Sequence, residues 1–186
     1  MQYTRNWLIQ QADSQSRLKY LHFWGHKPAP DGLITATCFS QWWEGHPFDE
    51  NGHTYLTTEH YMMAGKARLF KDDEMLVQIL ACESPGEAKK LGRQVRNFDQ
   101  ETWKMHRCDI VIQGNYLKFS QHQGLKTFLL QTGERIIVEA SPRDRIWGIG
   151  MGRNNENAEN PEKWRGSNLL GFCLMEVRDR LRLETA

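Results

Sequence analysis

The sequence lacks an apolar run long enough to cross a bilayer, and its first 20 residues contain neither the apolar core nor the small-residue cleavage site of a secretory signal. It also lacks an excess of charge, since 24 basic residues face 23 acidic ones, so no general field would recruit nucleic acid or an anionic membrane. These absences favour a cytoplasmic protein without a membrane partner. They leave its oligomeric state open.

Motifs for metal, redox and nucleotide chemistry are missing as well. The four cysteines form no C-x-x-C pair, which is typical of reduced thiols. The seven histidines include no H-E-x-x-H or comparable ligand spacing, so we expect no metal ion and no cofactor. No serine lies in a G-x-S-x-G turn, and Gly150 and Gly152 lack the strand–turn–helix unit of a dinucleotide site.

The pattern that remains is mainly helical, and 186 residues suit one domain. The clearest helix start is Ser84-Pro85-Gly86-Glu87, which combines a capping serine, a proline at the first helical position and a glutamate two residues later. Capping residues and apolar spacing predict helices over 57–70, from 72 or 73, from 84, and over 99–121, 125–131 and 169–183.

Short strands are expected in three places. Residues 33–39 alternate and carry Thr and Ile, and 136–139 form a brief apolar run. The dipeptide Asn51-Gly52 favours positive φ at both positions and predicts a hairpin between Phe48 and residues 53–56. The expected fold class is therefore α+β, a single compact domain that is mainly α with small β elements.

Glu59 and Lys66 lie seven residues apart on the helix expected over 57–70, so they share a face with the apolar Met62, Met63 and Phe70. Opposite charges in an apolar stripe could form part of a catalytic site. The same pattern is also found at helix edges, where long side chains reach water. The residue types alone leave both interpretations open.

A glycine-rich loop follows the last expected strand. Asp144 precedes Trp147 by three residues, and Gly148 and Gly150 would let the backbone approach a ligand such as a sugar. The alternative is an ordinary surface loop whose Trp147 fills a gap in the core.

Basic residues gather where the third helix is expected. They could bind phosphate, although a run of charge on a helix is commonly a solvated face. The residues concerned are Lys89, Lys90, Arg93 and Arg96.

An ordered set of motifs spans most of the chain. It runs through Phe39-Ser40, Tyr55-x-x-x-Glu59-His60-Tyr61, Ala64-Gly65-Lys66, Ser84-Pro85, Ala88-x-x-Leu91-Gly92-Arg93, Leu117-Lys118-Phe119-Ser120-Gln121, Val138-Glu139-Ala140-Ser141, Asp144-x-x-Trp147-Gly148-Ile149-Gly150 and Asn168-x-Leu170-Gly171-x-x-Leu174-Met175. In this order the motifs resemble the YbiA-like N-glycosidase family, also called the NADAR domain, over residues 23–182, after a polar leader of residues 1–22. Gln41-Trp42 departs from the family pattern, in which an Asn and another aromatic are common.

The resemblance implies a compact, mainly helical, metal-free hydrolase of N-glycosyl bonds. The implied substrates are early riboflavin intermediates, the ribosylamino-pyrimidine 5′-phosphates, and the implied products are ribose 5-phosphate and a diamino- or triaminopyrimidine. Such an activity would remove reactive metabolites in a damage-control role. The expected catalytic residues are Glu59, Lys66 and Asp144, and the expected substrate-binding residues are Phe39, Ser40, His60, Arg93, Trp147 and Gly148.

Two mechanisms fit this reaction, which builds positive charge on the ribose and negative charge on the departing nitrogen. In the first, Glu59 or Asp144 stabilises the sugar and orients water while an acid protonates the leaving group. In the second, Lys66 attacks a ring-opened imine and forms a Schiff base. The sequence leaves both open.

Two other functions also remain. Members of the wider superfamily are associated with removal of ADP-ribose from guanine, so ADP-ribosylated guanine in nucleic acid is an alternative substrate. A non-catalytic module that binds ADP-ribose or a nucleotide is the other alternative. A binder, however, has no need of two carboxylates beside a lysine.

Overall fold

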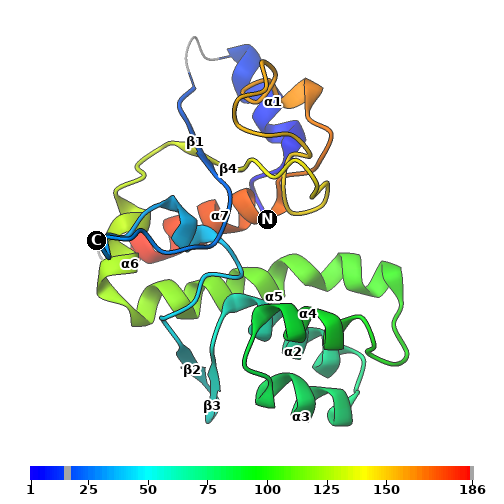
Figure 1. Cartoon of the computed structure of the whole chain (residues 1–186). Coiled ribbons are helices and arrows are strands. Elements are labelled where there is room, and N and C mark those ends of the chain that lie inside the picture. Colours follow the sequence, from blue (N-terminus) through cyan, green and yellow to red (C-terminus); the bar gives the residue numbers. More distant parts are fainter. Residues whose placement is uncertain (15–17, 185–186) are drawn as a thin grey trace.

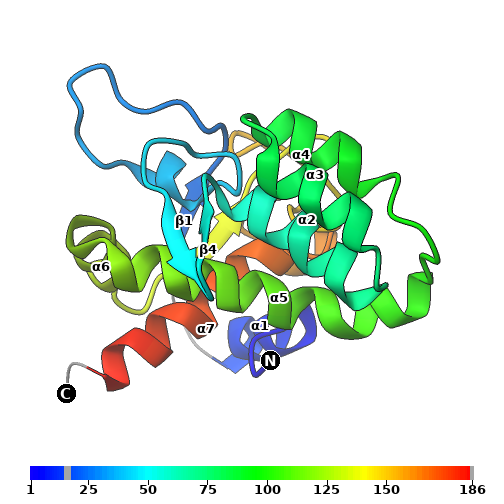
Figure 2. The same cartoon turned by 90° about the horizontal axis from the view of Figure 1, so that it is seen from below.

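The long helix α5 (Gln100–Gln121) runs through the middle of the molecule (Figure 1). The computed structural model describes residues 1–14 and 18–184. Helices α2 (Thr58–Leu69), α3 (Asp73–Ala81) and α4 (Pro85–Gly92) lie on one side of α5, and α7 (Leu169–Leu183) lies on the other (Figure 1). In the view from below, α7 passes behind α5 (Figure 2). A shorter helix, α6 (Gln123–Leu130), follows α5.

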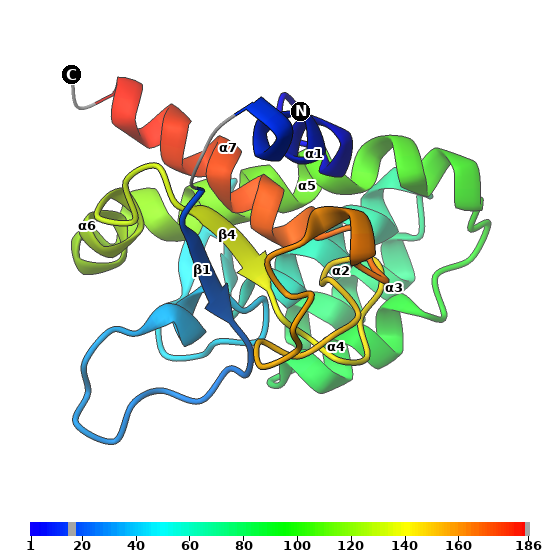
Figure 3. The same ribbon diagram turned by 90° about the horizontal axis from the view of Figure 1, so that it is seen from above.

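A two-stranded parallel sheet lies on α7. It pairs β1 (Tyr20–Phe23) with β4 (Ile136–Glu139), and Phe23 lies opposite Glu139 at the ends of the two strands. Figure 3 shows the two strands side by side, with the loops that follow β4 reaching over the rest of the molecule. The sheet therefore brings two segments that are more than 110 residues apart in the sequence side by side.

The predicted hairpin is confirmed. Strands β2 (Phe48–Glu50) and β3 (His53–Tyr55) pair in antiparallel fashion. The turn residues Asn51 and Gly52 have φ angles of 52° and 78°, so both occupy the left-handed region. With these small sheets and helices as the main elements, the predicted α+β class is also confirmed.

The predicted helix starts are confirmed by their caps. In each of four helices, a side-chain oxygen of the capping residue accepts a hydrogen bond from a backbone amide in the first turn. The capping residues are Thr57 for α2, Asp72 for α3, Ser84 for α4 and Asp99 for α5.

The expected strand over residues 33–39 is wrong. The segment instead ends in a short 3₁₀ helix, η1 (Ala36–Phe39), and no described strand pairs with it. Cys38 and Phe39 are neighbours and both fully buried, whereas a half-buried strand would bury alternate side chains. Phe39 packs against Phe23 and Phe119, so tertiary packing outweighs the local β propensity.

The segment expected as a polar leader is folded where it is described. It contains α1 (Arg5–Ser14) and most of β1, and Leu8 in α1 is fully buried. The Arg5 side chain donates a hydrogen bond of 2.7 Å to the carbonyl of Pro161, and the amide of Tyr3 donates one of 3.1 Å to Glu176 in α7. Among residues 1–14 and 18–184, no helix is both long and apolar enough to cross a membrane.

Candidate active site

Glu59 is buried in the first turn of α2, with 3% of its surface exposed. Its Oε1 atom is covered and has no hydrogen-bond partner. The pKa of Glu59 is raised to about 7, mainly by burial and also by the negative charge of Asp144. Lys89, a hydrogen bond from the Trp42 side chain, and Arg93 oppose this increase. Glu59 can therefore exchange a proton near neutral pH.

Gln41 fixes the start of α2. Its carbonyl oxygen accepts hydrogen bonds from the Glu59 amide at 2.9 Å and the Thr58 hydroxyl at 3.3 Å. Its side-chain oxygen accepts a 2.8 Å hydrogen bond from Asn115 in α5. The backbone at the start of α2 is thus linked to the central helix by a buried polar network.

Glu139 is the second acid of the site, and this partly buried residue ends β4. Its Oε2 atom is covered and has no hydrogen-bond partner. The pKa of Glu139 is raised to about 8, first by burial and then by the charges of Asp144 and Glu59, while Lys89 opposes the increase. Two carboxyl groups from opposite sides of α5 therefore influence each other at one site.

The loop after β4 folds back onto this strand. The carbonyl of Glu139 accepts a 2.9 Å hydrogen bond from the amide of Ile149. A Cβ atom at Gly148 would lie 2.8 Å from the same carbonyl, so glycine is needed there. Oδ1 of Asp144 accepts a 2.7 Å hydrogen bond from the amide of Trp147, which closes the turn. Asp144 thus shapes the loop and also places negative charge beside both buried acids.

Lys89 in α4 is a cation shared by Glu59 and Glu139, because it lowers the pKa of both. Its ammonium group lies 5.5 Å from the centre of the Trp42 ring. We call Glu59, Glu139, Asp144, Lys89 and Trp42 the carboxylate site.

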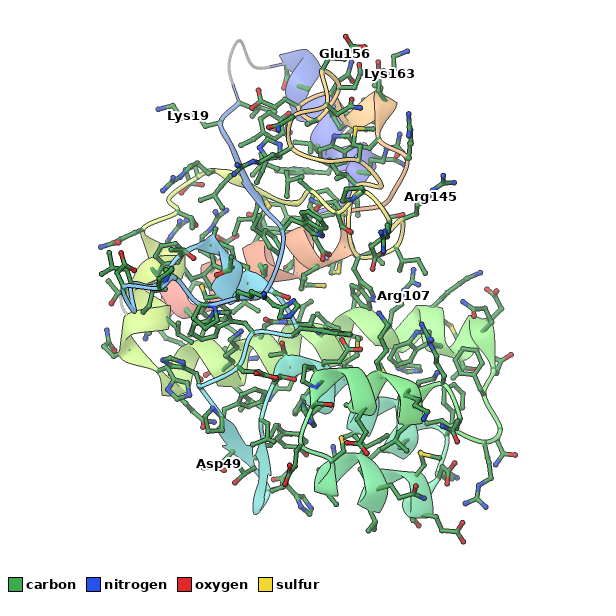
Figure 4. The ribbon with its side chains drawn as sticks, viewed as in Figure 1. Lys19, Asp49, Arg107, Arg145, Glu156 and Lys163 are labelled. Atoms are coloured by element: carbon green, nitrogen blue, oxygen red, sulfur yellow. The ribbon has the colours of Figure 1, made fainter. Side chains whose placement is uncertain are left out.

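Arg107 and Trp147 border this site. The guanidinium of Arg107 lies 5.9 Å from the centre of the Trp147 ring, and its Nε atom is covered without a hydrogen-bond partner. Figure 4 shows Arg107 on the side of α5 that faces the loop carrying Arg145. Arg93, by contrast, is exposed at the end of α4, where its charge still acts on Glu59.

The structure does not pair Lys66 with Glu59. The Lys66 ammonium donates a 2.7 Å hydrogen bond to the carbonyl of Gly92 and lies 4.1 Å from the centre of the Phe98 ring. Its pKa is lowered, and burial is the cause. The cation that acts on Glu59 most strongly is Lys89.

Phe39 and His60, both expected to bind substrate, lie in the core. Phe39 is fully buried among aromatic rings. His60 is 2% exposed, and its ring nitrogens lie 2.8 Å from the Thr57 hydroxyl and 3.2 Å from the carbonyl of Cys82. Both side chains are therefore part of the packed interior next to the segments that carry the site.

Ser40 and Lys118 order the segment that leads to Trp42. The Ser40 hydroxyl accepts a 3.2 Å hydrogen bond from the Trp42 amide. The buried Lys118 of α5 reaches across to donate a 2.6 Å hydrogen bond to the carbonyl of Cys38. Burial lowers the pKa of Lys118 to about 8.

Sequence reasoning placed Glu59, Asp144, Trp147 and Gly148 in one region, but it missed Glu139. A glutamate that ends an apolar strand usually marks the passage to solvent, so its type and position gave little signal. The clue that the sequence offered was the place of Glu139 inside the family-like motif Val138-Glu139-Ala140-Ser141. Trp42 and Arg107 carried no signal as site residues.

The carboxylate site has the groups that bond cleavage at a sugar requires. The pKa values of Glu59 and Glu139 are raised to about 7 and about 8, the third carboxylate can stabilise positive charge, and the cations can hold an anion. Within the described ranges, no group of three or more His, Cys, Asp or Glu side chains is arranged to hold a metal ion.

Comparison with known proteins identifies the family. The NADAR domain matches residues 22–182. The chain belongs to the NADAR family. Among NADAR proteins it is 43% identical over 169 residues to N-glycosidase R617 of Acanthamoeba polyphaga mimivirus, across 87% of this chain and 95% of that one.

Two bacterial comparisons agree. N-glycosidase YbiA of Escherichia coli (strain K12) is 31% identical over 146 residues, which cover 78% of this chain and 80% of YbiA. The NMR structure of E. coli YbiA matches with a TM-score of 0.71 at 26% identity, covering 95% of this chain and 93% of that chain. The expected YbiA-like NADAR fold is therefore confirmed.

Proposed function

We propose that this protein is an N-glycosidase that hydrolyses the bond between C1′ of ribose 5-phosphate and the exocyclic nitrogen of an aminopyrimidine. The substrate class is that of the early riboflavin intermediates, and the products are ribose 5-phosphate and a diamino- or triaminopyrimidine. Removing these reactive compounds would be a metabolite damage-control activity. Several NADAR relatives are named as N-glycosidases, which supports the reaction class.

The observation that carries this proposal is a pair of acids, the buried Glu59 and the partly buried Glu139. Glu59 and Glu139 each keep a covered oxygen without a hydrogen-bond partner. A buried carboxyl group that is left unsatisfied destabilises a fold, so its retention points to a task in the reaction. Glycoside hydrolysis commonly needs two such groups, one beside the departing atom and one beside the sugar and its attacking water.

The other members of the site have roles that follow from their charge. Glu59 and Asp144 would stabilise the positive ribose ring as the bond lengthens, and Glu59 would orient the water. Arg93 and Arg107 offer guanidinium groups for the 5′-phosphate at the border of the site. The aromatic face of Trp147 would lie against the substrate, as its place beside Arg107 suggests.

ADP-ribosylated guanine is the second candidate substrate, because further space and charge lie beside the site. A cavity of about 760 Å³ opens next to β4 and is lined by Phe23, Trp24, Ala140 and Arg153, among others. Several exposed arginines near the carboxylate site make no ion pair with a described carboxylate. They are Arg143, Arg145, Arg153 and Arg165. A diphosphate with a second ribose would use such room and charge.

The test is release of ribose 5-phosphate from ribosylamino-pyrimidine 5′-phosphates by purified protein, with ADP-ribosylated guanosine assayed in parallel. The Glu59→Gln variant should lose at least about 100-fold in kcat/KM. The matched control is Glu83→Gln, the same change at an exposed glutamate between α3 and α4. It should retain full activity.

Each outcome has a definite meaning. Cleavage of the pyrimidine compounds that depends on Glu59 supports the proposal. Cleavage of ADP-ribosylated guanosine alone would replace the substrate class and keep the reaction. Binding of either ligand without any cleavage would show a binding module and overturn the enzymatic function.

A further inference from the structure

The reaction proposed above leaves one requirement without a named residue. An exocyclic amine is a poor leaving group, so the departing nitrogen needs a proton as its bond to C1′ breaks. The donor must be a group that is protonated at neutral pH and lies beside the sugar-binding carboxylates. Glu59 cannot both give this proton and activate the water at the same moment.

The surroundings of Glu139 favour its protonated form. Its Oε2 atom is covered and receives no hydrogen bond. The negative charges of Asp144 and Glu59 face it, and Lys89 is the one cation that offsets them appreciably. Ionising this group would place a third negative charge in a confined space, so the carboxylic acid is the stable state.

The surroundings of Glu59 differ in kind. Trp42 donates a hydrogen bond to the Glu59 carboxyl group, and both Lys89 and Arg93 favour its charged form. The pKa is accordingly about 7 for Glu59 and about 8 for Glu139. The surroundings of Glu59 thus favour a charged carboxylate, which suits a base, and those of Glu139 favour a neutral carboxylic acid, which suits a proton donor.

Glu139 is also held more firmly than a surface glutamate. Its amide donates a 2.9 Å hydrogen bond to the side-chain oxygen of Asn168, and its carbonyl accepts one of 2.9 Å from Ile149. The backbone that carries the acid is thus fixed by Asn168, the residue before α7, and by Ile149 in the loop after β4. A fixed position suits a proton donor, because transfer requires hydrogen-bond distance to the leaving atom.

We propose that Glu139 is the general acid of the reaction and that Glu59 is the general base. The C1′–N bond breaks with its electron pair on nitrogen, and that nitrogen takes the proton from the Glu139 carboxyl group. Water bonds to C1′ and gives its proton to Glu59. Transfer of that proton to solvent and reprotonation of Glu139 return both groups to their starting states, with one water consumed. This inference rests on the proposed function.

The experiment compares two leaving groups in the full-length protein. One substrate is a ribosylamino-pyrimidine 5′-phosphate, and the other is 4-nitrophenyl ribofuranoside 5-phosphate, whose nitrophenolate leaves without a proton. Glu139→Gln should reduce kcat/KM by about 100-fold or more on the amine and by less than about 10-fold on the nitrophenyl compound. Glu59→Gln should reduce both, and Glu83→Gln should reduce neither.

A second variant covers a failure to fold. Glu139→Asp retains a carboxylic acid on a shorter side chain, so it should keep measurable activity on the amine together with the alkaline fall in its pH profile. Equal losses of Glu139→Gln on both substrates, or full activity on the amine, would overturn the assignment of the acid while leaving the N-glycosidase intact. If the wild-type protein cleaved no amine substrate, the proposed function and this inference would both fall.

Discussion

The side chain of Asn168 spans the backbone of β4 next to Glu139. Its Oδ1 atom accepts a 2.9 Å hydrogen bond from the Glu139 amide, and its Nδ2 atom donates one of 2.9 Å to the carbonyl of Ile137. Asn168 is fully buried and adopts a left-handed backbone, with φ of 53°. The Asn168 side chain therefore makes two hydrogen bonds to the edge of β4 that a neighbouring strand would otherwise make.

Asn168→Asp should both destabilise the protein and lower its activity. An aspartate has the same shape, but it loses the donor to Ile137 and buries a charge beside Glu139. We expect a loss of about 1–3 kcal/mol in the free energy of unfolding, seen by denaturant titration. The matched control is Asn97→Asp, because Asn97 is exposed and also left-handed, with φ of 55°. Equal stability of the two variants would show that the link to β4 is unimportant.

The pH dependence of kcat/KM should be bell-shaped. Glu59 must be ionised to act as base, so activity should rise as pH increases through about 7. Glu139 must be protonated to act as acid, so activity should fall as pH increases through about 8. Because the two groups influence each other, the two apparent pKa values belong to the pair. A profile that stays flat from pH 6 to about 10 would contradict these roles.

Stability should depend on pH in the opposite way to a usual surface carboxylate. The pKa of Glu139 is raised on folding, from 4.5 to about 8, so the folded state binds more protons between these values. The contribution to stability is therefore complete below pH 4.5 and is lost as pH rises through about 8. Glu139→Gln should raise the melting temperature at pH 9 and leave it unchanged at pH 4, which differential scanning calorimetry can measure. An equal change at both pH values would point to altered packing.

Substitutions of Lys66 and of Lys89 should have different effects on activity. We expect Lys66→Met to keep kcat/KM within about 10-fold, because Lys66 contacts Gly92 and Phe98 instead of the buried acids. Lys89→Met should shift the activity profile to higher pH, since Lys89 lowers the pKa of both acids.

Borohydride added during turnover decides whether Lys66 forms a Schiff base. We expect no adduct of substrate with Lys66, as judged by peptide mass spectrometry. An adduct that disappears in Lys66→Met would restore the covalent mechanism, and the enzyme would then have to bring its substrate to the Lys66 side of α2.

Local elements could be predicted from the sequence because their causes are local. Ser84-Pro85 begins α4 and Asn51-Gly52 turns the hairpin through interactions within a few residues. The interval 33–39 was misjudged because burial of adjacent residues, Cys38 and Phe39, depends on distant aromatic rings.

Some residues of the site could likewise be predicted from local sequence, and others could not. Glu59 was identified from its place on a helix and from the family-like motif around it. The importance of Glu139 arises from Asp144, Lys89 and Glu59, which other elements bring to it. The spacing of residues along one helix cannot reveal contacts between side chains of different elements. The same spacing suggested that Glu59 and Lys66 interact, but Lys66 instead donates a hydrogen bond to Gly92.

Chemical labelling of Lys118 would report local opening of the structure around its amine. Its amine is 1% exposed and hydrogen-bonded to the carbonyl of Cys38, so an acylating reagent cannot reach it in the closed state. Lys71, which is exposed just after α2, is accessible throughout. The ratio of labelling at these two amines would follow, in a single mass spectrum, how often the segment before Trp42 detaches from the central helix.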